Sequence, residues 1–137
     1  EIHCYHPQPY YEPSQVHLRL ITPRFLVLVH RTLISSGLFF IQTDNPGYWH
    51  YIRAIVPVFF DFHERIGRWP DAPKGRTRRE IIALRRGLPI FRGWGTPKQG
   101  VSEAEALRLA EALPPPLFDA DRRLRELDAW EKKDLRI

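Results

Sequence analysis

Apolar residues along this chain of 137 residues recur with two different spacings, which predicts helices alternating with short strands. Residues 1–6 and 38–44 are apolar runs of strand length, and the second run closes in polar residues, as buried strands often do. Between them Thr22-Pro23 is a helix start signal, and apolar residues at helical spacing predict a helix over residues 23–33. Strand, helix and strand together predict a βαβ unit.

The alternation continues along the chain. Asn45-Pro46 starts a second helix, which we expect Pro57 to end, and the run at 58–66 predicts a third strand. A short basic helix over residues 76–87 and a last strand over residues 88–94 follow. This order predicts an α/β fold, with an open and mostly parallel sheet and helices on both of its faces.

The final segment has a different character. Ser102 and Glu105 form a capping box that starts a helix, three prolines end that helix, and Asp119 starts another that reaches about Lys133. We therefore divide the chain into a main α/β region, residues 1–98, and an appended α-helical hairpin, residues 99–137.

Basic residues are concentrated in one block. The net charge of the chain is +5, yet residues 65–98 alone hold ten Lys or Arg residues and two acidic residues. Such an Arg-rich block is typical of a protein that binds a polyanion, because each neutralised phosphate releases counterions. A solvated protein face is an equally good interpretation of the charge by itself.

Composition and hydropathy exclude some classes of protein and indicate the compartment. No apolar run approaches the roughly 18 residues that cross a bilayer, and no signal pattern is present, so we expect no membrane partner and a cytoplasmic location. Cys4 is the only cysteine, which excludes an internal disulfide and fits a reducing compartment. The chain starts at Glu1 and contains no Met, so we expect it to begin partway through a larger protein.

Polar residues follow the first two predicted strands. Gln8 lies between two prolines after the first strand, and Asp44 follows the second. Because ligands bind beyond the carboxyl ends of parallel strands, we expect Gln8 and Asp44 to face one crevice. Asp44 has a second interpretation as a turn residue, since Asp-Asn-Pro favours a turn.

Thr77 and Glu80 also have two compatible interpretations. Their spacing is that of a capping box, which explains both residues without a ligand. The same helix start, flanked by Arg76, Arg78 and Arg79, is also a potential anion site. The histidines and Cys4 near the N-terminus lack the spacing of metal ligands, so we expect no metal.

Three stretches, taken in order, carry a resemblance to a known family. They are HPQPYYEPSQVHLRLITPRFLVLVHRTL at residues 6–33, FFIQTD at 39–44 and RTRREIIALRRG at 76–87. Their order and spacing resemble those of the bacterial tRNA (guanine-N7-)-methyltransferases, and the resemblance covers about residues 1–92.

This resemblance implies the C-terminal half of a Rossmann-like class I methyltransferase, which uses S-adenosylmethionine to methylate guanine N7 in tRNA. It implies that Gln8 and Asp44 occupy catalytic positions. It places substrate contacts on Asp44, Thr77 and Glu80, cofactor contacts on Gln8, Thr77 and Glu80, and an RNA contact on Arg19. From the basic block and the helix start we add Arg78 and Arg79 as substrate contacts and Arg76, Arg85 and Arg86 as RNA contacts.

The chain also departs from the family. Gln8 replaces an aspartate, Tyr10 replaces a tryptophan, and no Gly-rich loop between a strand and a helix is present; Gly93-x-Gly95 reads as a loose turn. We therefore expect the chain alone to be inactive, to bind S-adenosylmethionine weakly or not at all, and to need the upstream half of the same protein. One alternative is a non-catalytic RNA-binding relative, and another is a helical interaction module built on residues 99–137.

Overall fold

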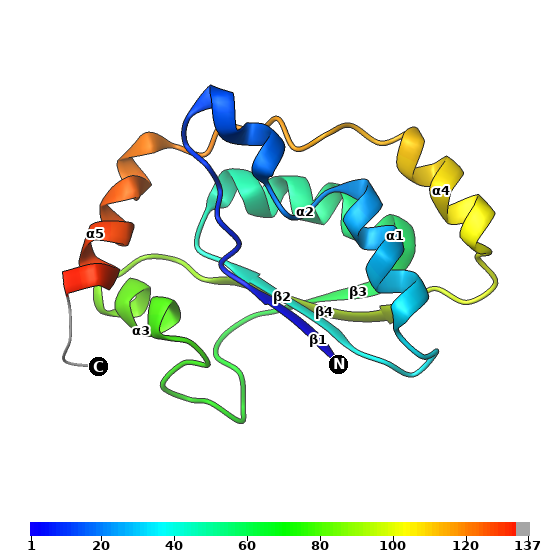
Figure 1. Ribbon diagram of the computed structural model, residues 1–137. Coiled ribbons are helices and arrows are strands. Elements are labelled where there is room, and N and C mark those ends of the chain that lie inside the picture. Colours follow the sequence, from blue (N-terminus) through cyan, green and yellow to red (C-terminus); the bar gives the residue numbers. More distant parts are fainter. Residues whose placement is uncertain (134–137) are drawn as a thin grey trace.

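The computed structural model describes residues 1–133 and places four strands in one sheet, with helices around it (Figure 1). The strands are β1 (Ile2–Tyr5), β2 (Phe39–Thr43), β3 (Phe60–Arg65) and β4 (Phe91–Pro97). The helices are α1 (Pro23–Thr32), α2 (Pro46–Phe59), α3 (Arg78–Arg85), α4 (Glu103–Glu111) and α5 (Glu126–Lys133), with short 3₁₀ turns η1 (Pro13–Leu18) and η2 (Arg122–Arg125). No helix of the described part of the chain is both long and apolar enough to cross a bilayer.

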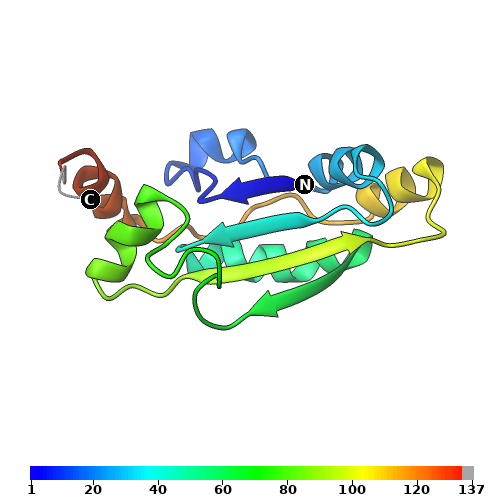
Figure 2. The same cartoon turned by 90° about the horizontal axis from the view of Figure 1, so that it is seen from below.

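The order of the strands is β1-β2-β4-β3, and only one of the three pairings is parallel (Figure 2). β1 and β2 pair in parallel, as the βαβ unit requires, whereas β4 runs antiparallel to both β2 and β3. The prediction of a mostly parallel sheet was therefore wrong for β4. The reason is that α3 lies beyond the end of the sheet at which β3 ends (Figure 2). The chain therefore enters β4 from that same end and runs antiparallel to β3.

β4 also contains the two glycines that the sequence suggested were a loose turn. A Cβ on Gly95 would lie 2.7 Å from the carbonyl oxygen of Asp61 in β3, and one on Gly93 would meet the ring of Phe62. The glycines thus permit close strand packing, and that prediction of a turn was wrong.

One face of the sheet carries the hydrophobic core. Phe39 and Ile41 of β2 are fully buried against α1 and α2, together with Leu26 and Ile52 of those helices. α2 continues through Pro57 to Phe59, so Pro57 does not end the helix as expected. Pro57 has no N–H group to donate to the carbonyl of Arg53. Because Arg53 is exposed to water, this missing hydrogen bond costs the helix less stability than it would in the core.

The opposite face carries a row of ring side chains. His3, Phe40, Trp94 and His63 are register partners across all four strands, and the outer pairs have ring centroids 4.6 Å apart. The loop at residues 66–77 lies on this side and inserts the buried Trp69 beside Phe40. Within residues 1–133 no helix covers this face, so the expectation of helices on both faces was wrong.

The final two helices lie at opposite ends of the molecule and do not form the predicted hairpin (Figure 1). α4 packs on α1 and contributes Ala106 and Ala110 to the core, whereas α5 packs on α3. The segment between them is tied to the body by Asn45, whose Nδ2 donates to the carbonyl of Ala120 at 2.7 Å. The division at residue 98 stays a prediction, and residues 134–137 of the proposed extension lie outside the described residues.

Candidate functional site at the carboxyl ends of β1 and β2

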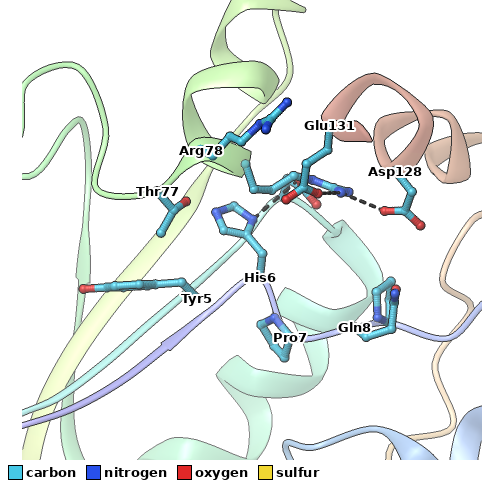
Figure 3. Close-up of a pocket in the computed structure, with 11 residues that line it drawn as sticks. Tyr5, His6, Pro7, Gln8, Thr77, Arg78, Asp128 and Glu131 are labelled. Atoms are coloured by element: carbon cyan, nitrogen blue, oxygen red, sulfur yellow. Dashed lines mark hydrogen bonds and ion pairs between the residues drawn. The ribbon is translucent and has the colours of Figure 1, made fainter. Parts of the chain in front are cut away.

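A polar pocket of ≈ 250 Å³ lies where β1 and β2 end (Figure 3). Four segments build it: the turn after β1, the end of β2, the start of α3 and one face of α5. Its lining residues are Tyr5, His6, Pro7, Gln8, Pro9, Asp44, Thr77, Arg78, Arg79, Asp128 and Glu131.

Parallel pairing of β1 and β2 brings Gln8 and Asp44 to this one pocket. The His6 amide donates to the carbonyl of Gln42 at 2.7 Å, which continues the ladder past the end of β1. Pro7 and Pro9 then stiffen the turn and leave Gln8 exposed at the rim, while Asp44 is only 6% exposed. The expected turn role of Asp44 falls to its neighbour, since Asn45 caps α2 by accepting from the Tyr48 amide at 3.0 Å.

Arg79 is the main partner of Asp44. Its Nε donates to Asp44 Oδ2 at 2.8 Å, and its Nη1 donates to Asp128 at 2.7 Å and to Glu131 at 2.9 Å. A guanidinium offers five N–H donors in a planar fork, so one side chain can satisfy carboxylates from β2 and α5 together. Arg79 thus holds α5 beside the end of β2, because it bonds Asp44 and two carboxylates of α5.

Asp44 and Arg79 stabilise each other's charged form. Burial opposes ionisation of Asp44, but the facing His6 ring and the positive charge of Arg79 outweigh it and lower the pKa of the Asp44 carboxyl. Burial also opposes the charge on Arg79, yet Asp44, Asp128 and Glu131 together raise its pKa. Asp44 is therefore a carboxylate at neutral pH and can only accept hydrogen bonds.

Thr77 and Glu80 form the capping box, but only Thr77 reaches the pocket. Thr77 Oγ1 accepts from the Glu80 amide at 3.1 Å, and Glu80 Oε2 accepts from the Arg76 amide at 2.9 Å. Glu80 is fully buried, and its other oxygen accepts from Arg92 at 3.2 Å. The structure therefore separates Glu80 from the pocket that it was expected to line.

The four arginines expected to contact RNA lie in different surroundings. Arg19 is 3% exposed and donates to the carbonyls of Pro9 and Pro116 at 2.6 and 2.7 Å. Its side chain therefore links the turn after β1 to the segment after α4. Arg76 donates to Asp71 at 2.9 Å and lies over Trp69, whereas Arg85 and Arg86 are exposed on α3 and just after it, with Arg86 above Trp130. None of the four lines the pocket.

Several pocket residues escaped the sequence analysis. Asp128 and Glu131 lie in α5, some fifty residues from Arg79, and no local spacing signals their return to the site. No role in the site was predicted for His6, although its place directly after a strand and before Pro7 was an available signal. No three His, Cys, Asp or Glu side chains in residues 1–133 come together as a metal site.

Comparison with known proteins gives one weak match. The chain is 27% identical over 101 residues to the tRNA (guanine-N(7)-)-methyltransferase of Rubrobacter xylanophilus, a match that covers 66% of this chain and 42% of that protein. The match thus spans less than half of the relative's length. No protein-family model and no solved structure matches the chain. The similarity supports a distant relationship to a methyltransferase, which agrees with the resemblance of the three sequence stretches.

Proposed function

We propose that this chain belongs to an enzyme that transfers a methyl group from S-adenosylmethionine to N7 of a guanine in tRNA. The observation that carries the proposal is the convergence of Gln8, Asp44, Thr77, Arg78 and Arg79 on one pocket at the carboxyl ends of β1 and β2. Sequence similarity to a tRNA (guanine-N(7)-)-methyltransferase supports the same reaction class. A cytoplasmic location is part of this proposal, since it is where we expect tRNA to be modified.

The chemistry of the pocket suits this reaction. Guanine N7 carries a free lone pair, so methyl transfer to it needs alignment and exclusion of water rather than a general base. Asp44, ionised and buried, is placed to accept from the N1–H and N2–H groups of the base. The purine gains positive charge in the reaction, and the lining holds three carboxylates against two guanidiniums, a balance that favours a cation.

On this proposal, residues 1–133 supply only part of the cofactor site. Gln8 and Thr77 could touch S-adenosylmethionine, but Glu80 is engaged with Arg92 and lies outside the pocket. A volume of ≈ 250 Å³ is also below the range, roughly 300–1,000 Å³, of pockets that enclose a ligand of drug size. When bound, the cofactor supplies the methyl group as an electrophile, and the residues described here would hold and orient the acceptor.

We further propose that an upstream segment of the same protein completes the site and the sheet. The outer edge of β1 has no strand partner among the described residues, and the nearby side chain of Ile34 is 73% exposed. On the opposite face, no helix within residues 1–133 lies over the ring row His3, Phe40, Trp94 and His63 (Figure 1). An added strand and helix would satisfy both surfaces.

For tRNA contact we propose the exposed basic residues of the loop at 66–77 and of α3. They are Arg68, Lys74, Arg78, Arg85 and Arg86, and Arg78 also lines the pocket. Part of the basic block is neutralised internally, because Arg76, Arg79 and Arg92 pair with Asp71, Asp44 and Glu80. The polyanion surface is accordingly smaller than the charge count alone suggests.

The deciding experiment measures transfer of labelled methyl groups from S-adenosylmethionine into tRNA by the full-length protein. Asp44→Ala should lower the rate at least about tenfold, since it removes a charged acceptor. Asp61→Ala is the matched control, because Asp61 is an exposed aspartate on β3 outside the pocket. Transfer that is unchanged by Asp44→Ala would overturn the site. RNA binding without any transfer by the wild-type protein would instead support the non-catalytic relative.

A further inference from the structure

His6 is a buried side chain with an unused hydrogen-bonding atom. Its side chain is 8% exposed and lines the pocket, and its Nδ1 is buried without a hydrogen-bond partner in the described part of the chain. Its backbone has a φ of +49°, in the left-handed region that a non-glycine residue rarely occupies. A strained backbone and an unsatisfied buried atom at one residue point to a functional requirement.

A chain of hydrogen bonds fixes the proton position on the His6 ring. The indole Nε1 of Trp69 can only donate, and it lies 2.7 Å from the amide oxygen of Gln42. The amide nitrogen of Gln42, which also can only donate, therefore faces His6 Nε2 at 3.0 Å. Because Nε2 must accept, the proton of the neutral ring resides on Nδ1.

This Nδ1–H group points toward Asp44. The Nδ1 atom lies 3.6 Å from Asp44 Oδ2, longer than an ordinary hydrogen bond, and that oxygen already accepts from Arg79 Nε at 2.8 Å. In the lining of the pocket, a buried donor of His6 thus lies beside an acceptor of Asp44. Figure 3 shows the His6 ring among the other pocket residues.

We propose that His6 is a base-recognition residue: its Nδ1–H donates to O6 of a guanine whose N1–H and N2–H groups are held by Asp44. This inference rests on the proposed function, and it names the group that selects the base. Adenine carries an amino donor and an unprotonated ring nitrogen at the corresponding positions, so it opposes both groups. A site that hydrogen-bonds a ligand discriminates strongly against an analogue with the wrong partner, since its buried groups are then left unpaired.

Substitutions at two positions separate the role of the donor from that of the ring. His6→Asn places an amide N–H near the position of Nδ1, and asparagine tolerates a left-handed backbone. His6→Phe keeps a ring but removes the donor. Gln42→Glu leaves only acceptors opposite Nε2 and so moves the proton away from a pure Nδ1–H form, without altering a pocket-lining residue.

The test uses the full-length protein with ¹⁵N-labelled histidine, titrated by NMR with guanosine 5′-monophosphate and, as the control, adenosine 5′-monophosphate. We expect a protonated Nδ1 and an unprotonated Nε2 for His6 in the wild-type chain. The guanine nucleotide should shift the His6 signals, and the adenine nucleotide should bind at least about tenfold more weakly. His6→Asn should keep the preference, and His6→Phe and Gln42→Glu should lose it. The wild-type fingerprint spectrum reports whether each variant folds.

Three results would overturn the inference: a proton on Nε2 in the wild-type chain, His6 signals that ignore the guanine nucleotide, or a folded His6→Phe chain with unchanged preference. The methyl-transfer assay on the full-length protein separates this inference from the proposed function. Guanine selection by His6 without methyl transfer would refute the reaction alone. Methyl transfer with an unchanged preference in His6→Phe would refute the role of His6 alone.

Discussion

Replacement of Arg79 by methionine tests the ion-pair cluster that joins β2, α3 and α5. Methionine keeps much of the side-chain length but leaves Asp44 without its main partner at a position that is 6% exposed. Removing one partner of a buried pair typically costs about 3–5 kcal/mol of unfolding free energy. Asp128 and Glu131 are 32% and 39% exposed, so the loss of these two contacts adds at most about 1 kcal/mol each.

Protonation of Asp44 limits the cost. An unpaired buried carboxylate can take up a proton, and from a reference pKa of about 3.9 this requires about 4 kcal/mol at pH 7. We therefore expect Arg79→Met to lose about 3–4 kcal/mol at pH 7 in urea unfolding followed by circular dichroism. The deficit should shrink as the pH falls toward about 4, because protonation then becomes nearly free.

Two comparisons make this prediction specific. Arg53→Met is the matched control, since the Arg53–Glu64 pair at 3.1 Å is exposed on both sides and should contribute at most about 1 kcal/mol. The double variant Arg79→Met/Asp44→Asn should lose less than the sum of the two single changes, because the unpaired charge is gone. Equal losses for Arg79→Met and Arg53→Met, or an Arg79→Met deficit that does not depend on pH, would refute the reasoning.

Three further predictions concern stability. Because the pKa of Asp44 is lowered in the folded protein, its contribution to the free energy of unfolding is complete above the unfolded pKa of about 3.9 and is lost as the pH falls through the folded value. Asp44→Asn should reduce this loss of stability in acid unfolding. An unchanged dependence of stability on pH in the variant would contradict this. Gly47→Ala should destabilise by about 1–3 kcal/mol in urea although alanine favours helices, because its Cβ would lie 2.1 Å from the Asp119 carbonyl; a gain in stability would show that residues 114–120 pack elsewhere. Thr77→Ala should cost about 1 kcal/mol by loss of the cap on α3 and Thr77→Ser should restore most of it, whereas equal stability of the two variants would remove the cap as the cause.

Local hydrogen bonding explains what the sequence alone determined. Thr22, Asn45, Thr77 and Ser102 each accept from the amide three residues later, so the starts of α1, α2, α3 and α4 could be predicted from single short motifs. The βαβ unit was also predictable, because a helix between two short apolar runs favours parallel pairing. From that unit it followed that Gln8 and Asp44 lie at one end of the sheet.

Only the tertiary structure decided the direction of β4, the separation of α4 from α5 and the partners of Arg79. Each depends on contacts between residues far apart in the chain, such as the 2.7 Å bond between Arg79 and Asp128, and no local spacing encodes them. The proton position on His6 is of the same kind, since it follows from Trp69 donating to Gln42 and from Gln42 in turn facing the His6 ring. Caps and periodicity act over a few residues, whereas the chemistry of the pocket arises where distant segments pack together.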